Sequence, residues 1–470
     1  MGNETQSVSG NILFKLFWWI ALHINPQWAH KLMYFGLRDG SFGRTVMRDP
    51  ALSVKVWGHT FNTPIGIAGG VDKKGNVIDR LMQIGYGFGA FGPYTLEKEM
   101  PVKQTHYFKK ERSILVQSLG FRNPGLLKML PWFVKRRYLP YFVGVDLAIP
   151  AESEEQNIKQ GRHFTYQEEF VLMAQKVAPY CDFITLDLSH PNSELSMLVV
   201  DASTMVPMIK AVREAVRVAA PIQTPPILVK IPLDLNAQEI PLVTQNLMDG
   251  GADGVIVAGP LSLSKNNLLQ LPGMKDEHIG MLTGALVQEQ TVNLIRQIYE
   301  KTKGKLVIVG CGGVFSAEDA MAQIYAGASL IQMDNASLTF AGPNCVADIH
   351  KNLLRMLKEK NFENISRAVG FAMTEGNGPA GENPAPTTGT APQPATGTVA
   401  PTAPVTPMAP VTPAAPVTPA PVTPAPVMPT APAAPQPVTP QPVAPQPNPG
   451  TNPTAAPQTP VSGNVPPEQQ

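Results

Sequence analysis

The chain has 470 residues and a formal net charge of +1, and its 49 prolines are spread very unevenly. From Gly376 onward it holds 29 prolines, two acidic residues and no aromatic residue, lysine or arginine, so that stretch cannot bury a core. The foldable part, residues 1–375, has a net charge near +3 once those two acids are left out, which argues against a nucleic-acid partner. Cys181, Cys311 and Cys345 show no paired spacing, which argues against a disulfide framework or a metal site and suits a reducing compartment.

Residues 1–40 are predicted to form a helical hairpin. Residues 11–24 are apolar and aromatic, but this run is too short to span a bilayer and lacks the basic start of a signal peptide. Asn25-Pro26 indicates the N-cap and first position of a second helix that runs through Leu37. Such aromatic-rich short helices favour a peripheral position at a membrane surface. The alternative is a hairpin folded onto the rest of the chain.

Residues 41–375 alternate strand-like and helical patterns. The strand-like runs are Ile65–Ala68, Phe88–Phe91, Phe142–Leu147, Phe183–Leu188, Ile227–Ile231, Gly254–Val257, Leu306–Val309 and Ser329–Met333. The clearest amphipathic helical segments between them are Phe164–Ala178, Ser203–Val218, Ala237–Asp249 and Val287–Lys301. This alternation predicts a parallel sheet, and eight repeats predict a closed (β/α)8 TIM barrel, in the α/β class, with its active groups beyond the strand carboxyl ends. The less regular segment 93–140 is expected to fold over the barrel mouth.

The stretch 305–335 carries the strongest local pattern. Its first apolar run is followed by Gly310, Gly312 and Gly313, where a sharp turn leaves backbone N–H groups bare. Ser316 is expected to cap a helix of about ten residues that ends near Ala326-Gly327. Polar Asp334 and Asn335 follow the last strand. The arrangement predicts a phosphate cradle late in the barrel; an ordinary βαβ unit with glycine turns is the alternative.

Residues 376–470 repeat Val-Thr-Pro, for example at 405–407, 411–413 and 417–419. This composition favours extended polyproline II segments and a disordered tail. The tail is expected to act as a spacer, as a docking strand for a proline-reading partner, or simply as a solvated appendage.

Several motifs, in order along the chain, are similar to those of one known family. They are NPQWAH (25–30), FNTPIGIAGGVDKKG (61–75), GFRNPG (120–125), SHPN (189–192), LVKIPLDL (228–235), GADGVIV (251–257), LTG (282–284) and VGCGGVFSAEDA…AGASLIQM (309–333). Residues 16–357 thereby resemble class 2 dihydroorotate dehydrogenases, membrane-associated FMN enzymes of pyrimidine biosynthesis that use quinone. The helix pair before the barrel is what points to the quinone-using class.

The resemblance implies a role for individual residues. The implied FMN contacts are Gly69, Gly70, Lys73, Asp146, Asp187, Lys230, Gly284, Gly313, Asp334 and Asn335, the last four at the ribityl phosphate. The implied substrate contacts are Lys73, Gln117 and Asn192, the implied base is His190, and the implied quinone contacts are His30 and Lys109. A buried lysine suits negative charge on a reduced flavin. The alternatives are salt-bridge roles for Lys73 and Lys230 and a loop-capping role for His190.

The same positions depart from the family pattern. His190 stands where the family has a serine base, and Gln117, Asp146, Asp187 and Gly259 stand at asparagine positions. Pro93, Ala258 and Pro260 replace threonines, and Asp334 replaces a neutral side chain. An asparagine amide donates and accepts hydrogen bonds, whereas an aspartate only accepts and repels an anionic substrate unless it is protonated. A histidine, by contrast, suits proton abstraction at neutral pH.

Two hypotheses follow. In the first, the chain is a flavoenzyme that oxidises dihydroorotate to orotate, with FMN as cofactor and quinone as acceptor, at the cytoplasmic side of a membrane. In the second, the barrel has lost dihydroorotate turnover and serves as a ligand-binding or scaffold protein, or as a flavoenzyme for another substrate. The fold by itself does not decide between them.

Overall fold

The computed structural model describes the chain from Pro26 to Met373 with internal gaps. The described ranges are 26–44, 48–99, 106–109, 113–117, 121–136, 141–150, 164–190, 198–258, 260–263 and 280–373. The first predicted helix, residues 11–24, and the proline-rich stretch 376–470 lie outside these ranges.

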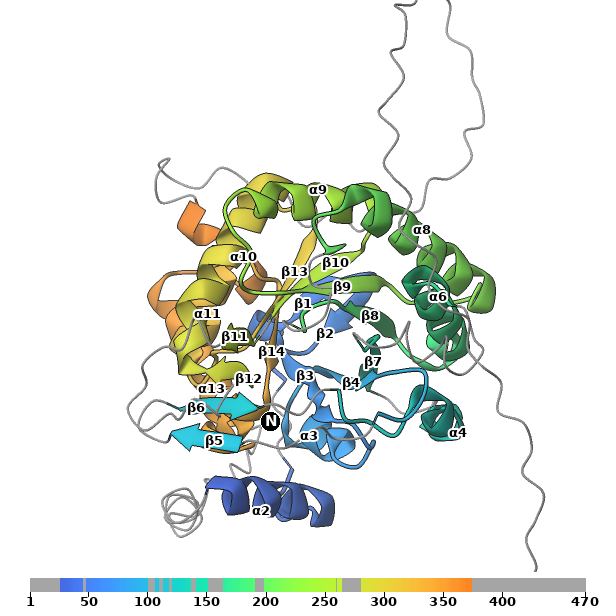
Figure 1. Cartoon of the computed structure of the whole chain (residues 1–470). Helices are drawn as coiled ribbons and strands as arrows, with labels where there is room; N and C mark the ends of the chain where they lie inside the picture. Colours follow the sequence, from blue (N-terminus) through green and yellow to red (C-terminus); the bar gives the residue numbers. More distant parts are fainter. Residues whose placement is uncertain are drawn as a thin grey trace, which may run out of the picture. The chain divides into compact units, whose positions relative to one another are not determined.

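Eight parallel strands close into a barrel, which confirms the predicted fold (Figure 1). They are β3 Ile65–Asp72, β4 Phe88–Tyr94, β7 Phe142–Leu147, β8 Phe183–Asp187, β9 Ile227–Ile231, β10 Gly254–Ala258, β13 Val307–Cys311 and β14 Leu330–Met333. Their order around the barrel follows their order in the sequence, and the ring closes where Gln332 of β14 pairs with Gly66 of β3. All eight carboxyl ends therefore point to one rim, as expected for this architecture.

Helices surround the strands (Figure 1). The longer ones are α6 Tyr166–Val177, α8 Ala202–Ala219, α9 Glu239–Gly250, α10 Gln288–Thr302, α11 Ala317–Ala326 and α13 Cys345–Glu359, and α3 Ile78–Ile84 follows the first barrel strand. The predicted helical segments are confirmed within a few residues. The predicted cap is also present, because the Ser316 hydroxyl accepts the N–H of Asp319 while the Asp319 carboxylate accepts the N–H of Ser316, forming a capping box.

Large apolar side chains fill the barrel interior, and glycines on neighbouring strands make room for them. A Cβ added at Gly66 would lie 2.4 Å from the ring of Phe88, and one at Gly144 would lie 2.3 Å from the ring of Phe183. Phe88 and Phe183 are both almost completely buried. These strand glycines are therefore set by packing, since protein interiors are close-packed and leave no room for an extra methyl group.

Several barrel strands extend further than their apolar runs predicted, among them β4, which continues to Tyr94. β3 continues through the Gly69-Gly70 pair to Asp72, and β13 continues through Gly310 to Cys311. The expectation that Gly310 lies in the turn is therefore wrong: a Cβ at Gly310 would lie 2.2 Å from Oε1 of Gln323, so packing against α11 requires glycine there. The turn itself begins at Gly312 and Gly313, whose φ angles are +90° and +72°.

A four-stranded antiparallel sheet accompanies the barrel and was not predicted. Its strands, in spatial order, are β11 Leu261–Leu263, β12 Gly280–Gly284, β6 Ile114–Gln117 and β5 His106–Lys109. It joins part of the irregular segment 93–140 to the segment after β10, with Leu282 paired to Val116. The other smaller elements are the β1 Val54–Val56 and β2 His59–Phe61 hairpin, α4 Leu126–Arg136 and α12 Asn335–Ala341.

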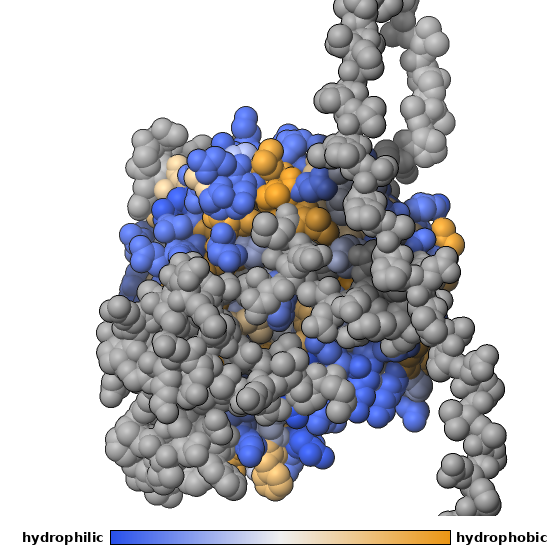
Figure 2. Space-filling model, in the orientation of Figure 1, coloured by the Kyte–Doolittle hydropathy of each residue, from blue (hydrophilic) through white to orange (hydrophobic). Residues whose placement is uncertain are grey.

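The second predicted N-terminal helix is present as α2, Pro26–Asp39, and it packs against the barrel domain. Met33 and Leu37 on one face are fully buried, whereas Leu32 and Phe35 are 36% and 66% exposed. Within the described residues, no helix combines the length and apolar character needed to cross a bilayer. The described surface on the face seen in Figure 2 is largely hydrophilic, with smaller hydrophobic patches.

Candidate active site

A cavity opens at the carboxyl ends of the barrel strands, where the TIM-barrel rule predicts the active groups. Its floor comes from barrel strands and their tips, and its cover comes from Phe121 and from two residues of β12, Met281 and Thr283. The remaining lining residues are Ala68, Gly69, Gly70, Lys73, Pro93, Asp187, Ser189, His190, Lys230, Pro260, Cys311, Gly312, Asp334 and Asn335. The expectation that part of the segment 93–140 covers the barrel mouth is thus confirmed at Phe121.

Lys230 lies between two buried carboxylates. Its Nζ is 2.9 Å from Oδ2 of Asp187 and 3.9 Å from Oδ2 of Asp146. The side chains of Lys230 and Asp187 are 10% and 4% exposed, and that of Asp146 is fully buried. Asp187 also accepts hydrogen bonds from the backbone N–H and the hydroxyl of Ser189, at 3.0 and 2.6 Å. The lysine is therefore an ion-pair partner of Asp187, as the salt-bridge alternative anticipated.

This arrangement separates the pKa values of the two acids. Burial alone would raise the pKa of Asp187, but the charge of Lys230 and the bonds from Ser189 hold it below its usual value. Burial raises the pKa of Asp146 to about 7, although Lys230 acts in the opposite direction. Burial alone would lower the pKa of Lys230, but the two carboxylates raise it above its ordinary value. At neutral pH, Asp187 and Lys230 are thus a charged pair beside a half-protonated Asp146.

His190 and Lys73 line the same cavity, and both contact Phe121. The His190 ring lies 4.7 Å from the ring of Phe121, and Lys73 Nζ donates a hydrogen bond of 2.9 Å to the Phe121 carbonyl. Burial lowers the pKa of His190, with Lys73 and Lys230 acting in the same direction, so its imidazole is neutral at pH 7. Burial also lowers the pKa of Lys73 to about 8. A neutral imidazole beside a lysine that readily loses its proton is suited to acid–base chemistry.

Two lining glycines leave backbone bare toward the cavity. A Cβ added at Gly70 would meet no atom within 4 Å, and the nearest atom to one at Gly312 would be 3.5 Å away. Both have positive φ angles, +102° and +90°. The hydroxyl oxygen of Thr283, which is buried at the cavity, has no hydrogen-bond partner among the described residues. Bare backbone and an unsatisfied hydroxyl are what a flat, polar ligand requires.

The far end of the cavity is formed by the start of α12. Asp334 is the N-cap, and its Oδ1 accepts the N–H and the hydroxyl of Ser337 at 2.8 and 2.9 Å. Asn335 donates from Nδ2 to the Gly70 carbonyl at 3.0 Å and accepts from the Tyr34 hydroxyl of α2 at 3.2 Å. Tyr34 also donates to the carbonyl of Val71. The N-terminal helix is thereby bonded directly to residues that border the cavity.

Comparison with known proteins agrees with this geometry. The model of the family described as "Dihydroorotate dehydrogenase" matches residues 51–357, more than half of the chain. The chain belongs to the dihydroorotate dehydrogenase family. It is 29% identical to a dihydroorotate dehydrogenase (quinone) of Rhodospirillum rubrum, over 78% of this chain and 97% of the relative. It is 30% identical to the mitochondrial dihydroorotate dehydrogenase (quinone) of Mus musculus, over 74% of this chain and 87% of that relative.

Solved structures of the family share the fold. The DHODH of Eimeria tenella in complex with ferulenol superposes with a TM-score of 0.66 at 22% identity, covering 74% of this chain and 96% of that one. Its ligand-free form gives a TM-score of 0.65 at 23% identity, covering 74% and 99%. At this identity the likeness shows the common barrel fold.

Eight residues to which the family resemblance assigns a role line this one cavity. They are Gly69, Gly70, Lys73, Asp187, His190, Lys230, Asp334 and Asn335. Asp146 lies against them, because a Cβ at Gly69 would be 1.7 Å from Asp146 Oδ2. Gly284 and Gly313 lie outside the lining; each is packed against backbone, of Ser113 and of Gln288 respectively.

The remaining predicted site residues lie elsewhere or outside the described part. His30 is on α2, with Nδ1 3.1 Å from the Thr339 hydroxyl of α12. Gln117 and Lys109 end β6 and β5, but their side chains are not described. Asn192 and Gly259 fall outside the described residues. Among the described residues no group of three acids, histidines or cysteines is placed to hold a metal ion.

Sequence reasoning did not single out Met281, nor four further residues that the structure brings to the cavity. Ser189 positions Asp187, Thr283 presents an unsatisfied hydroxyl, and Phe121 and Cys311 line the walls. All four lie inside motifs that the resemblance had already picked out, SHPN, LTG, GFRNPG and VGCGGV. The available signal was therefore membership of a motif, but only the folded chain shows which side of each motif faces inward.

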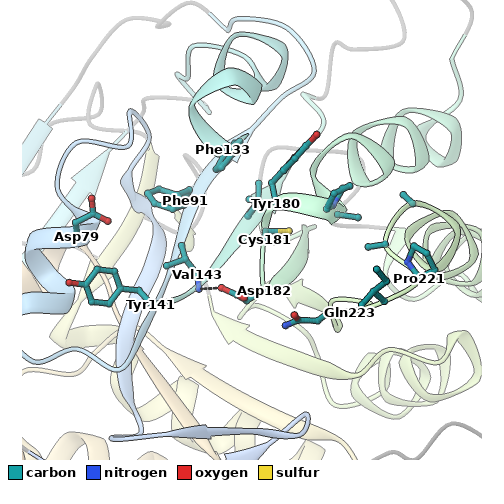
Figure 3. A pocket seen from close by; sticks show the side chains of 16 residues that line it. Asp79, Phe91, Phe133, Tyr141, Val143, Tyr180, Cys181, Asp182, Pro221 and Gln223 are labelled. Atoms are coloured by element: carbon teal, nitrogen blue, oxygen red, sulfur yellow. Dashed lines mark hydrogen bonds between the residues drawn. The ribbon is translucent and has the colours of Figure 1, made fainter. Parts of the chain in front are cut away.

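A second cavity lies away from the strand carboxyl ends (Figure 3). Its aromatic walls come from Phe91 of β4, Phe133 of α4 and Tyr180, and it also includes Tyr141 and Asp182, which precede β7 and β8. Asp182 Oδ2 accepts the backbone N–H of Val143 at 2.8 Å. This carboxylate therefore has a structural role, and the cavity lacks the convergent lysines and histidine of the barrel mouth.

Proposed function

We propose that this protein is an FMN-dependent oxidoreductase of the dihydroorotate dehydrogenase type, which oxidises dihydroorotate to orotate with quinone as the electron acceptor in pyrimidine biosynthesis. The family membership supports the reaction class. The single observation that carries the proposal is the convergence of His190, Lys73 and Lys230 on one cavity with bare glycine backbone. The alternative of a scaffold barrel without catalysis has no comparable observation in its favour.

The residues around the cavity fit a bound FMN. Gly70 and Gly312 leave open space against bare backbone, and Thr283 has a hydroxyl to offer. Lys73 and Lys230 would hold the isoalloxazine ring, whereas Asn335 and the glycine turn at Gly312 would face the phosphate end. When bound, FMN would supply the hydride acceptor and the relay of electrons to quinone.

His190 is the proposed base. Because its imidazole is neutral at pH 7, it can take the proton from the substrate carbon while the hydride leaves. The ring of Phe121 fixes the imidazole and keeps water from that side. Lys73, tied to the Phe121 carbonyl, would orient the substrate with its two remaining donors, together with Gln117 and Asn192.

The quinone and the membrane are assigned to α2. His30 and Lys109 are the proposed quinone contacts, and the exposed Leu32 and Phe35 would rest on the membrane surface together with residues 11–24. Support comes from the bonds that join α2 to the cavity, through Tyr34 to Asn335 and through His30 to α12. A quinone held under α2 would therefore lie close to the far end of the site.

Anaerobic flavin reduction tests the proposal. Purified protein is expected to be yellow, with flavin absorbance near ~450 nm, and dihydroorotate should bleach that absorbance without oxygen. His190→Ala should retain FMN but reduce it about 10²- to 10⁴-fold more slowly, the usual contribution of a general base. A protein that takes up no FMN would refute the cofactor assignment, and an unchanged rate in the variant would remove His190 from the mechanism.

One observation favours a second substrate class. Asp187 neutralises Lys230, so the cavity floor offers little net positive charge to an anionic substrate. A flavoenzyme for an uncharged dihydropyrimidine would suit such a floor. Dihydrouracil, which lacks the carboxylate of dihydroorotate, distinguishes the two in the same assay: faster bleaching by dihydrouracil would favour this second function, and faster bleaching by dihydroorotate would favour the first.

A further inference from the structure

Asp146 is a buried acid whose hydrogen-bonding capacity is unused. It is fully buried, and neither carboxylate oxygen has a partner with hydrogen-bond geometry among the described residues, although the Thr185 hydroxyl on β8 lies near enough to act on its pKa in the lowering direction. Buried polar groups without partners are uncommon, because an unmade bond costs roughly 1–3 kcal/mol. An acid left in this condition at the edge of a ligand cavity indicates a partner that arrives with the ligand.

The position of Asp146 in the barrel directs it toward the cavity. Alternate strands of a TIM barrel contribute the side chains of one interior layer, and β3, β7, β9 and β13 are alternate strands here. Gly69, Lys230 and Cys311 on three of these strands line the cavity floor. Asp146 on the fourth touches both the Gly69 position and Lys230. It is therefore the fourth member of the layer on which a ligand would rest.

The charged neighbours of Asp146 leave its carboxylate poorly compensated. Lys230 is the one cation near it in the described residues, and that lysine is 1.0 Å closer to Asp187, at 2.9 against 3.9 Å. Asp187 itself adds a negative charge on the neighbouring strand β8, and the Cys311 thiol, whose pKa is raised by burial, stays neutral. One lysine shared unequally by two acids leaves the more distant acid easily protonated.

We propose that Asp146 binds the cavity's ligand in its protonated form, donating a hydrogen bond from its carboxyl group to an acceptor on the pyrimidine-like ring of FMN. The inference rests on the proposed function for the identity of the ligand. A protonated carboxyl group offers one donor and one acceptor, like an amide, whereas the ionised form only accepts and would face ring oxygens with a like charge. The pKa of about 7 for Asp146 places this change within the physiological range.

The test is FMN binding by the flavin-free protein, followed by fluorescence quenching from pH 6 to pH 9. Above the pKa of Asp146, each unit of pH should weaken binding to the wild type tenfold relative to Asp146→Asn, which keeps a donor at every pH. The ratio of the two Kd values should therefore rise on the order of 50-fold between pH 7 and pH 9. Comparing the two proteins cancels the titration of Lys73 and of the FMN phosphate.

Asp187→Asn is the matched control. The same chemical change on the neighbouring strand frees Lys230 for Asp146 and removes a repelling charge, so the loss of affinity should move to lower pH than in the wild type. If the wild-type and Asp146→Asn profiles superimpose, protonation of Asp146 makes no contribution to FMN binding, and its proton is shared only within the barrel, for example with Thr185. The inference is then overturned while the proposed function stands.

Infrared spectroscopy of the flavin-free protein gives an independent readout. The carbonyl stretch of a protonated carboxylic acid should be present at pH 6 and missing in Asp146→Asn. Absence of that difference would overturn the inference without reference to FMN. Failure of FMN to bind either protein at pH 6 would instead refute the proposed function and the ligand named here, and the infrared band would then show only that Asp146 carries a proton.

Discussion

At the scale of single residues, the cavity floor is governed by the competition of two acids for one lysine. Asp187 holds Lys230 at 2.9 Å and is further supported by Ser189, whereas Asp146 has Lys230 at 3.9 Å and no hydrogen bond among the described residues. Burial makes this difference large, because a charge in the interior is stabilised only by close, well-directed partners. Two chemically identical side chains therefore differ in protonation at neutral pH.

Replacing Lys230 should destabilise the fold, because it leaves a buried carboxylate without its ion-pair partner. Lys230→Met is expected to lower the free energy of unfolding by about 3–5 kcal/mol at pH 7, because Asp187 is left as an uncompensated buried charge. Urea unfolding measures the change. Arg355→Met is the control, since the Arg355–Glu359 pair is more than half exposed and its loss should cost less than about 1 kcal/mol. Equal effects in the two variants would contradict the importance assigned to burial.

The raised pKa of Asp146 also predicts how stability changes with pH in the flavin-free protein. Its pKa is about 7 in the folded state against 3.8 for the unfolded chain, so its contribution to stability is fully present below about pH 4 and is lost as pH rises through 7. Asp146→Asn should therefore gain stability relative to the wild type between pH 4 and pH 7, by up to about 4 kcal/mol, and remain level above that. A gain that appears only on acidification would show that Asp146 is ionised and paired.

At the scale of elements, α2 presents two faces of different character. Met33 and Leu37 are buried against the domain, and Tyr34 bonds to the residues beside the cavity. The opposite face exposes Leu32 and Phe35. A helix that is anchored by one face and exposes apolar side chains beside the basic Lys31 and Arg38 on the other is suited to rest on a membrane while remaining coupled to the site.

Substitution of an exposed apolar side chain of α2 tests the proposed membrane contact. Phe35→Ser in the full-length chain is expected to weaken cosedimentation with lipid vesicles by a factor of about 10 to 100, because burial of an aromatic side chain contributes roughly 1.5–3 kcal/mol. Its thermal stability should be unchanged. Leu242→Ser on α9 also removes an exposed apolar side chain, 54% exposed, and should leave lipid binding as it was. Unchanged cosedimentation of Phe35→Ser with lipid vesicles would show that this face of α2 does not contact the membrane.

At the scale of the whole molecule, the described residues after α13, up to residue 373, pack back against the barrel domain. The last described turn packs Phe371 against Tyr325 and Phe362, and the Gly370 N–H bonds to the Ile324 carbonyl. Ile365 in the same segment is 1% exposed. Among the described residues, buried packing therefore continues up to the segment just before the proline-rich stretch.

Removing that stretch should leave the barrel intact. Deletion of residues 376–470 is expected to change the free energy of unfolding by less than about 0.5 kcal/mol and to leave FMN content unchanged, since this stretch has 29 prolines and no aromatic residue with which to build a core. A deletion from residue 361 onward is the control, because it also removes Ile365 and the aromatic cluster and should cost several kcal/mol. Loss of stability in the shorter deletion would assign the tail a structural role.

The succession of apolar runs and helical periods along the sequence was sufficient to predict the barrel, its eight strands and the rim that bears the active groups. This is possible because parallel strands joined by helices have few ways to bury their apolar faces. Local chemistry likewise predicted the Ser316 cap, since a capping box depends on residues only three positions apart. The family resemblance added the residues that line the cavity.

Only the tertiary structure determined which of these residues form ion pairs and which acid lies farther from the lysine. Nothing local to Asp146, Asp187 or Lys230 indicates which acid takes the lysine, because the three lie on different strands and their distances follow from register and side-chain packing. The antiparallel sheet beside the barrel escaped prediction for a similar reason, since it pairs β6 with β12, which are more than 150 residues apart. Contacts set by closure of the barrel carry no signature in any short stretch of sequence, and in this protein those contacts determine the charge of the site.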